Sequence, residues 1–165
     1  MKEKQIRTDI TEATISLYGI DHITKIYKKA STLNSLINKE IGEDIIASYK
    51  RAFNILVSEL KNSDLKLSNT TDPAIFKNDY ERNLLKKIKE LRKYFTNINK
   101  DENYTESLTN LADAKKEIFE FFDNVKVNDE DKNIKKNRLE LLQMLCKTFD
   151  NYINFSNIEI KQWIN

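Results

Sequence analysis

The chain has 165 residues, of which 39% are hydrophobic and 33% are charged. This balance is typical of one globular domain of ordinary size and excludes a disordered chain. The formal net charge of +2 is too small for a protein that coats nucleic acid through bulk charge alone. Two glycines and one proline provide few tight turns, which favours long helices over a sheet-rich fold.

Apolar residues recur at helical spacing along the chain, which predicts an all-α bundle of about six to seven helices in a single domain, residues 1–165. Asp9 and Asp72 resemble N-caps, Pro73 suits a first helical position, and Gly19 ends a helix. The predicted segments cover about residues 9–17, 21–38, 43–60, 73–95, 104–122, 132–153 and 156–163.

The residues that usually carry enzyme chemistry are scarce. His22 is the only histidine and Cys146 the only cysteine, and one of each cannot build a structural zinc site. Gly19 and Gly42 stand too far apart for a glycine-rich phosphate loop. We therefore expect no catalytic residue, metal or cofactor in this domain. The single cysteine, the polar N-terminus and the lack of a long apolar run predict a cytoplasmic protein without a membrane segment.

A basic and amide edge is predicted on the segment 43–60. Lys50 and Asn54 are four residues apart and Arg51 and Asn54 three apart, so all three share one side of a helix, away from its apolar stripe. Such an edge suits RNA phosphates and base edges. The same spacing also fits a solvated face or a hydrogen-bonded seam between helices, and spacing alone favours that structural interpretation.

A second candidate region surrounds a short acidic loop. Phe122 and Val125 are predicted to close the core at a helix end, and Arg138 to form an ion pair with Asp123 that fixes the loop. A helix N-terminus favours anions, so the cations at the start of the next helix predict a phosphate site. These cations are Lys132, Lys135, Lys136 and Arg138. An ordinary charged helix start accounts for them equally well.

Four short motifs follow one another along the chain. They are Lys50-Arg51-Ala52-Phe53-Asn54-Ile55-Leu56, Asp72-Pro73-Ala74-Ile75-Phe76 with Glu81 to Leu84, Phe121 to Val127 with Asp129 to Asp131, and Asn137 to Leu142. In this order and spacing, from about Asp9 to Ile158, they resemble the C-terminal region of the bacterial glycyl-tRNA synthetase β subunit. Lys126 and Lys135 depart from the family pattern, which usually has methionine and arginine there, and Lys135 loses bidentate geometry.

The resemblance implies an α-helical, DALR-like anticodon-binding domain that grips the anticodon arm of glycine tRNA. It also implies that glycine activation with ATP and Mg²⁺ takes place elsewhere, mainly on the α subunit. The chain would then be the C-terminal piece of a longer β subunit, and its partners would be glycine tRNA, the rest of that subunit and the α subunit, with no DNA and no membrane. A helical protein–protein module that binds no RNA is the alternative, and an independent enzyme is a third interpretation.

Under this resemblance, basic and amide residues are the candidate RNA contacts. They are Lys50, Arg51, Asn54, Asn124, Lys126, Lys135, Lys136 and Arg138. The basic residues are expected to neutralise phosphates, Asn54 and Asn124 to read base edges, and Tyr104 or Phe121 to stack on a base. A structural role is expected for Phe122, Asp123, Val125, Asn137, Leu139 and Leu142.

Overall fold

The computed structural model describes residues 5–61, 63–98 and 102–159, and these residues form seven α-helices, three short 3-10 turns and no strand. The α-helices are α1 (Thr8–Tyr18), α2 (Ile23–Leu36), α3 (Glu40–Lys61), α4 (Asp79–Asn97), α5 (Tyr104–Ala112), α6 (Lys115–Asn124) and α7 (Lys132–Phe149). The predicted all-α fold class is confirmed. No helix in these ranges is long and apolar enough to cross a membrane.

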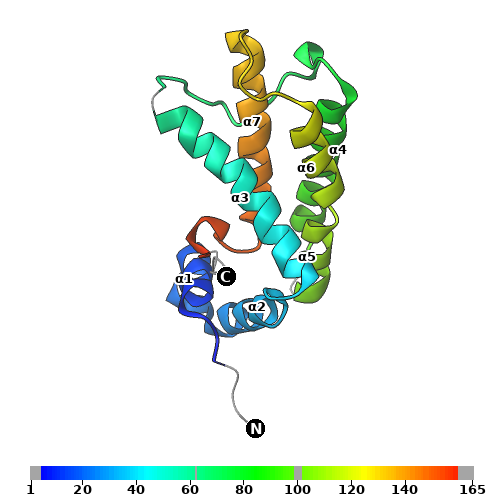
Figure 1. The fold of residues 1–165 in the computed structure, drawn as a ribbon. Coiled ribbons are helices and arrows are strands. Elements are labelled where there is room, and N and C mark those ends of the chain that lie inside the picture. The colour runs from blue at the N-terminus through cyan, green and yellow to red at the C-terminus, as the bar shows by residue number, and fades with distance from the viewer. Residues whose placement is uncertain (1–4, 62, 99–101, 160–165) are drawn as a thin grey trace, which may run out of the picture.

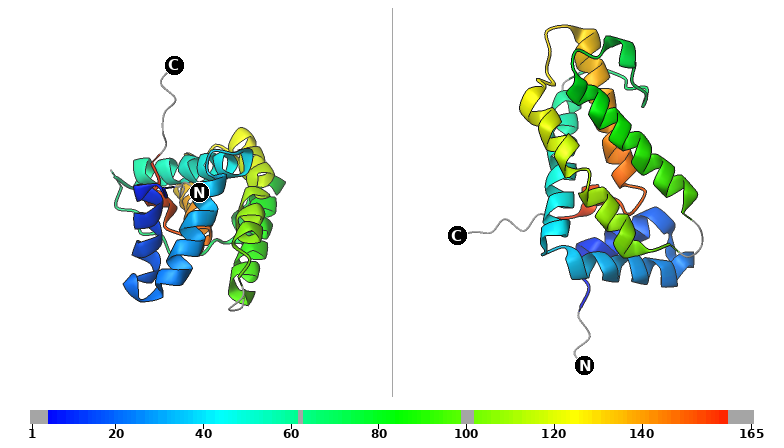
Figure 2. Two further views of the ribbon diagram at one scale, coloured as in Figure 1. Left: turned by 90° about the horizontal axis from the view of Figure 1, so that it is seen from below. Right: turned by 90° about the vertical axis from the view of Figure 1, so that its right-hand side faces the viewer.

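The helices α3 and α7 form the centre of the bundle and pack extensively against each other (Figure 1). α4 packs against α6 and α7, and α5 packs against α2 and α3. α1 and α2 form a hairpin at one end of α3, and the left-hand view of Figure 2 shows this hairpin from below. The 3-10 turn η3 (Phe155–Asn157) runs back against α1 and α3 and closes the bundle.

Aromatic side chains join the two central helices to the C-terminal turn. Tyr49 of α3, Phe149 of α7, and Tyr152 and Phe155 beyond α7 are each at most 1% exposed. The ring of Phe155 lies 5.6 Å from that of Tyr49, 6.1 Å from that of Phe149 and 6.4 Å from that of Tyr152, measured between centroids. Rings of this size contribute much of the buried apolar area, so this cluster fixes how the chain end packs.

A buried lysine connects α2 to the same region. The Nζ of Lys29 donates hydrogen bonds to the hydroxyl of Tyr18 and, at 3.1 Å, to the carbonyl oxygen of Tyr152. It also lies 3.3 Å from a carboxylate oxygen of Glu102 and 5.8 Å from the ring centroid of Tyr104. Burial lowers the pKa of Lys29 to about 8, against the opposing effect of Glu102.

The two glycines meet different backbone requirements. Gly19 follows α1 with a φ of 67°, which glycine adopts without strain, and it ends that helix as predicted. Gly42 lies in the first turn of α3, where a β-carbon would overlap the carbonyl oxygen of Leu36 and the Cα of Ile37. Glycine therefore lets the start of α3 lie directly against the end of α2.

The start of the fourth helix differs from the prediction. Asp72 accepts a hydrogen bond from the backbone of Ala74, but it caps only the 3-10 turn η2 (Pro73–Ile75). α4 begins six residues after Pro73, and its N-cap is Asn78, which forms a capping box with Glu81. Asp72 is therefore an N-cap, as predicted, but of a shorter element.

The predicted helix 104–122 is in fact two helices, α5 and α6, separated by a turn. Ala114 lies in this turn, and its N–H donates to the carbonyl oxygen of Leu111 at 3.3 Å. Leu111, Ala114 and Ile118 are all 0% exposed, so the bend directs both helices into the core. Tertiary packing therefore sets the bend in a stretch that has no glycine or proline to mark the break.

The start of α1 also differs from the prediction, because the helix begins at Thr8 and Asp9 lies inside its first turn. The carboxylate of Asp9 pairs with the guanidinium of Arg7 at 2.6 Å and accepts the N–H of Glu159 at 2.9 Å. Asp9 therefore joins the first helix to the end of the described chain instead of capping α1.

The last two predicted segments are shorter in the structure. α7 ends at Phe149, where residues up to 153 were expected to continue it, and Asp150 instead accepts the N–H of Phe155 at 3.0 Å. Of the predicted segment 156–163, the structure shows only the turn η3, and residues 160–163 lie outside the described part of the chain.

Candidate nucleic-acid interface

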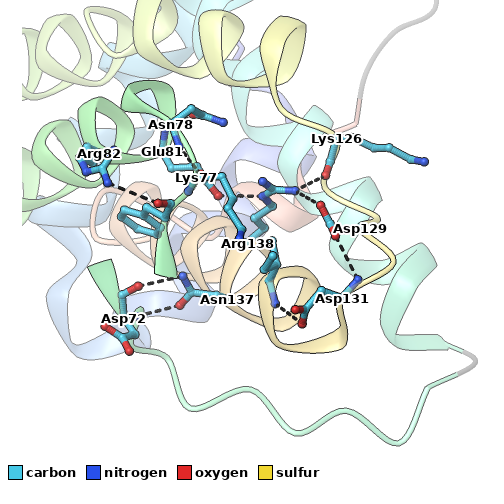
Figure 3. A network of polar contacts seen from close by, with 12 residues as sticks. Asp72, Lys77, Asn78, Glu81, Arg82, Lys126, Asp129, Asp131, Asn137 and Arg138 are labelled. Atoms are coloured by element: carbon cyan, nitrogen blue, oxygen red, sulfur yellow. Dashed lines mark hydrogen bonds and ion pairs between the residues drawn. The ribbon is translucent and has the colours of Figure 1, made fainter. Parts of the chain in front are cut away.

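Arg138 is the centre of a buried polar network at one end of the bundle (Figure 3). Its Nε donates to Oε1 of Glu81 at 2.7 Å, and its Nη1 donates to Oδ2 of Asp129 and to the carbonyl oxygen of Lys126, both at 2.8 Å. The Arg138 side chain is only 5% exposed. These bonds hold the start of α4, the loop before α7 and α7 itself in one arrangement.

The same network continues to both sides. The second carboxylate oxygen of Glu81 accepts the N–H groups of Lys77 at 2.7 Å and Asn78 at 3.1 Å. Beside Arg138, the Asn137 side chain accepts the N–H of Asp72 at 2.8 Å and donates to its carbonyl oxygen at 3.0 Å. Two consecutive residues of α7 therefore fix the segment that precedes α4 at both of its ends.

The predicted ion pair between Arg138 and Asp123 is wrong. Asp123 is 65% exposed and lies 3.8 Å from the guanidinium of Arg51 instead. Arg138 points into the bundle because Glu81, from a distant part of the chain, offers it a buried carboxylate. Its charge is taken up by two carboxylates and its side chain is buried, which removes Arg138 from the candidate phosphate contacts.

The side chains of the predicted basic edge of α3 point to two different parts of the molecule. The Nζ of Lys50 donates to the carbonyl oxygen of Ser156 at 3.2 Å, and burial lowers its pKa. The guanidinium carbon of Arg51 lies 4.6 Å from the ring centroid of Phe122 on α6, a cation–π distance. Asn54 is exposed. Arg51 and Phe122, from separate predicted regions, are thus brought together, whereas Lys50 faces the C-terminal segment.

The start of α7 does not offer the open phosphate site that was predicted. The carboxylate of Asp131 already accepts the N–H groups of Asn133 and Ile134, so it occupies the helix N-terminus. Lys135 forms an ion pair with Glu59 of α3 at 2.6 Å. These lysine and amide groups can bind a phosphate only by giving up a carboxylate. Lys136 has a longer contact, 3.9 Å, to the carboxylate of Glu140 on its own helix.

Two of the predicted contacts, Asn124 and Lys126, lie on open surface beside the network, and this surface is called the rim below. Lys126 is exposed, and Figure 3 shows its side chain extending away from Arg138. Its ammonium forms no ion pair within the ranges that the structure describes. Asn124 is exposed at the end of α6, where its side chain donates to the carbonyl oxygen of Glu120 at 2.8 Å. Arg138 holds only the backbone carbonyl of Lys126, so both side chains remain accessible to a ligand.

The residues predicted to stack on a base or to have a structural role range from fully buried to exposed. Phe121 is 0% exposed and cannot stack on a base, while Tyr104 is half-buried beside Lys29. Phe122 is half-buried beneath Arg51, and Asp123 is a surface residue. The remaining four residues for which a structural role was expected are buried: Val125, Asn137, Leu139 and Leu142.

Residues 45–162 match the family model described as DALR anticodon binding domain. The chain belongs to the DALR anticodon binding domain family. Over 130 residues it is 32% identical to the glycine–tRNA ligase β subunit of Rickettsia prowazekii (strain Madrid E), an alignment that covers 79% of this chain and 19% of that protein. Over 158 residues it is 30% identical to the glycine–tRNA ligase β subunit of Persephonella marina (strain DSM 14350 / EX-H1). That alignment covers 96% of this chain and 21% of that protein.

The predicted resemblance to the β subunit is therefore confirmed, and the chain spans about a fifth of the length of the curated relatives it matches. The DALR anticodon binding domain match begins in α3, so it includes the whole Arg138 network and leaves the α1–α2 hairpin outside. The network is thus a feature of the matched domain, whereas the hairpin packs against it from the N-terminal side.

Four exposed cations on one helix of this DALR domain lie outside the set of predicted contacts. They are Arg82, Lys86, Lys89 and Lys93, all on α4. Their spacing of four, three and four residues is the signal that reveals them, because it places all four on one side of a helix.

Proposed function

We propose that this chain recognises the anticodon arm of glycine tRNA as the C-terminal domain of a glycyl-tRNA synthetase β subunit in the cytoplasm. The observation that carries the proposal is the anticodon-binding family match, which spans the Arg138 network, together with relatives named glycine–tRNA ligase β subunit. In this proposal the whole enzyme glycylates the tRNA with ATP and Mg²⁺. The domain itself holds no cofactor and catalyses no step, and its partners are the rest of the β subunit and the α subunit.

The rim of the Arg138 network suits a single-stranded RNA loop. Sequence-specific RNA recognition depends on unpaired bases, whose edges are free to form hydrogen bonds with amide side chains. Asn124 offers such an amide at the end of α6, and Lys126, on the loop that follows, offers a cation without an ion pair in the described part of the chain. A loop held in place before binding loses little conformational entropy when RNA arrives, so its few contacts contribute more to affinity.

The paired candidates contribute in a different way. Arg51 and Lys135 lie in exposed or half-buried ion pairs of the kind that contribute little to stability. A phosphate can therefore replace the carboxylate partner at small cost in folding free energy. Lys50, Lys136 and Asn54 complete the proposed contact set, on the flank of α3 and at the start of α7.

The test is a binding titration of this chain with a minimal glycine-tRNA anticodon stem-loop. Fluorescence anisotropy monitors the binding at several salt concentrations. A phosphate-binding domain should show a linear fall of log K with log salt. A stem-loop with a swapped anticodon should compete less well than the glycine stem-loop. Equal competition by both RNAs, or no binding at low salt, would contradict the proposal and favour a protein–protein module.

A further inference from the structure

A row of cations runs along the outer side of α4. Arg82, Lys86, Lys89 and Lys93, here called the α4 row, are all exposed. Because a helix advances 1.5 Å per residue and turns once every 3.6 residues, the four Cα atoms follow one narrow stripe about 16 Å long. The right-hand view of Figure 2 looks onto this helix. A stripe of this length can contact several phosphates of one nucleic-acid strand.

The charges of the α4 row are largely free. Lys86, Lys89 and Lys93 form no ion pair with any carboxylate in the described ranges 5–61, 63–98 and 102–159. Arg82 has a loose contact at 3.3 Å with Asp79, whose side chain is 88% exposed. Unlike Arg51 or Lys135, these lysines need not give up a partner before they bind an anion.

A shallow hollow of about 410 Å³ lies against the row. Its apolar surface comes from Pro73, Phe76 and Leu85, and its polar surface comes from the four cations of the α4 row and one carboxylate, Glu90. Four cations against one carboxylate give the hollow a positive potential. An apolar floor with a cationic rim matches a sugar–phosphate chain, whose sugars are partly apolar and whose phosphates are charged.

The row begins beside the network that supports the proposed loop contacts. Glu81, the partner of Arg138, directly precedes Arg82, and Arg82 also donates to the carbonyl oxygen of Phe76 at 3.3 Å. Figure 1 shows the start of α4 and the loop before α7 at the same end of the bundle. An RNA hairpin whose loop meets Lys126 therefore has a direct path for its backbone along α4.

We propose that the α4 row is the surface of this domain that binds the sugar–phosphate backbone of the RNA hairpin. This inference rests on the proposed function and adds a surface to it that the predicted contacts on α3 and α7 do not include.

The test compares two triple variants of the chain in binding to the glycine-tRNA anticodon stem-loop. One variant carries Lys86→Ala, Lys89→Ala and Lys93→Ala. We expect it to lose at least about tenfold in affinity at low salt and to lower the slope of log K against log salt by about 2. The matched control removes the same charge from exposed lysines elsewhere, with Lys28→Ala, Lys39→Ala and Lys66→Ala. It should stay within about twofold of the unmodified chain and keep its salt slope.

Because alanine is the best helix former, α4 should remain folded, and circular dichroism melting curves check that it does. As a second variant, Lys89→Glu should weaken binding more than Lys89→Ala, since repulsion then adds to the lost attraction. If the unmodified chain binds and both α4 variants keep its affinity and salt slope, the α4 row is not the backbone site, while the proposed function stands. Equal losses in the two triple variants would show a bulk charge effect and overturn the inference. No binding by the unmodified chain would overturn both proposals.

Discussion

The Nε of Arg138 donates to Oε1 of Glu81 at 2.7 Å, and the two side chains are only 5% and 1% exposed. The two residues are 57 positions apart and join α7 to the first turn of α4. Two charges withdrawn from water in this way are stable only as a pair, since either one alone would be a desolvated charge without a counter-ion. The pair therefore fixes the geometry of the rim more than it adds to stability.

Removing one member of this pair should be costly. We expect Arg138→Met to lower the free energy of unfolding by about 3–5 kcal/mol, because Glu81 would be left buried without its cation. The double variant with Glu81→Gln should cost less than the sum of the two single variants, by about 1–3 kcal/mol. Urea denaturation measures all four proteins, and Arg82→Met, which removes an exposed cation next to Glu81, serves as the control. Additive effects of the two substitutions would show that the pair is not coupled.

The close approach of α2 and α3 gives a second prediction. Gly42→Ala should lower the free energy of unfolding by at least about 2 kcal/mol, because the added methyl group overlaps backbone atoms that cannot rotate away. Ser58→Ala, at an exposed position of the same helix, should change stability by less than about 0.5 kcal/mol. Thermal unfolding followed by circular dichroism compares the two, and equal melting temperatures would contradict this account of Gly42.

The sequence predicted those parts of the fold that depend on local periodicity. The stripe of Tyr49, Ala52 and Leu56 is buried in α3 because residues three and four apart share one side of a helix. The bend at Ala114 had no local signal, since packing alone directs the chain there. The sequence also could not identify the ion-pair partner of Arg138. Asp123 is near in the sequence and Glu81 is distant, and only the fold shows which carboxylate lies beside the guanidinium.

The candidate site shows the same division. Basic residues such as Lys135 and Lys89 are alike in the sequence, and only the fold shows that Lys135 faces Glu59 while Lys89 pairs with no carboxylate that the structure describes. The family resemblance was readable from the order of four motifs, because those motifs include residues of the Arg138 network that the fold itself requires. Free charge on the surface is a property of the tertiary arrangement.

The carboxyl group of Asp150 gives a prediction about pH. Burial raises its pKa from 3.8 to about 6, although it accepts hydrogen bonds from the N–H of Phe155 and the hydroxyl of Tyr49. The folded chain therefore binds this proton more tightly than the unfolded chain, so the charged carboxylate costs stability above pH 6, and this cost disappears as the pH falls towards 4. Asp150→Asn, which mimics the protonated form, should stabilise the protein by about 1–2 kcal/mol at pH 8 and by almost nothing at pH 4.

Urea denaturation between pH 4 and pH 8 measures this difference for Asp150→Asn against the unmodified chain. Asp64→Asn, at an exposed position in the link after α3, is the control and should give a difference near zero at every pH. A stabilisation by Asp150→Asn that stays constant across the pH range would show that titration of this carboxyl group is not its cause.

Two lysines of the proposed RNA contacts, Lys126 and Lys135, allow a free cation to be compared with a paired one. Lys126 is exposed on the loop held by Arg138, whereas Lys135 lies 2.6 Å from Glu59. We expect Lys126→Ala to lower affinity for the anticodon stem-loop several-fold and the salt slope by about 1. Lys135→Ala should change both less, because a phosphate that binds Lys135 must first displace Glu59, which offsets part of the gain. The double variant Lys135→Ala with Glu59→Gln also removes the carboxylate that Lys135→Ala leaves without a partner, and should bind RNA more tightly than Lys135→Ala alone. A larger loss of salt dependence from Lys135→Ala than from Lys126→Ala would mean that the start of α7, and not the loop that carries Lys126, makes the main phosphate contact.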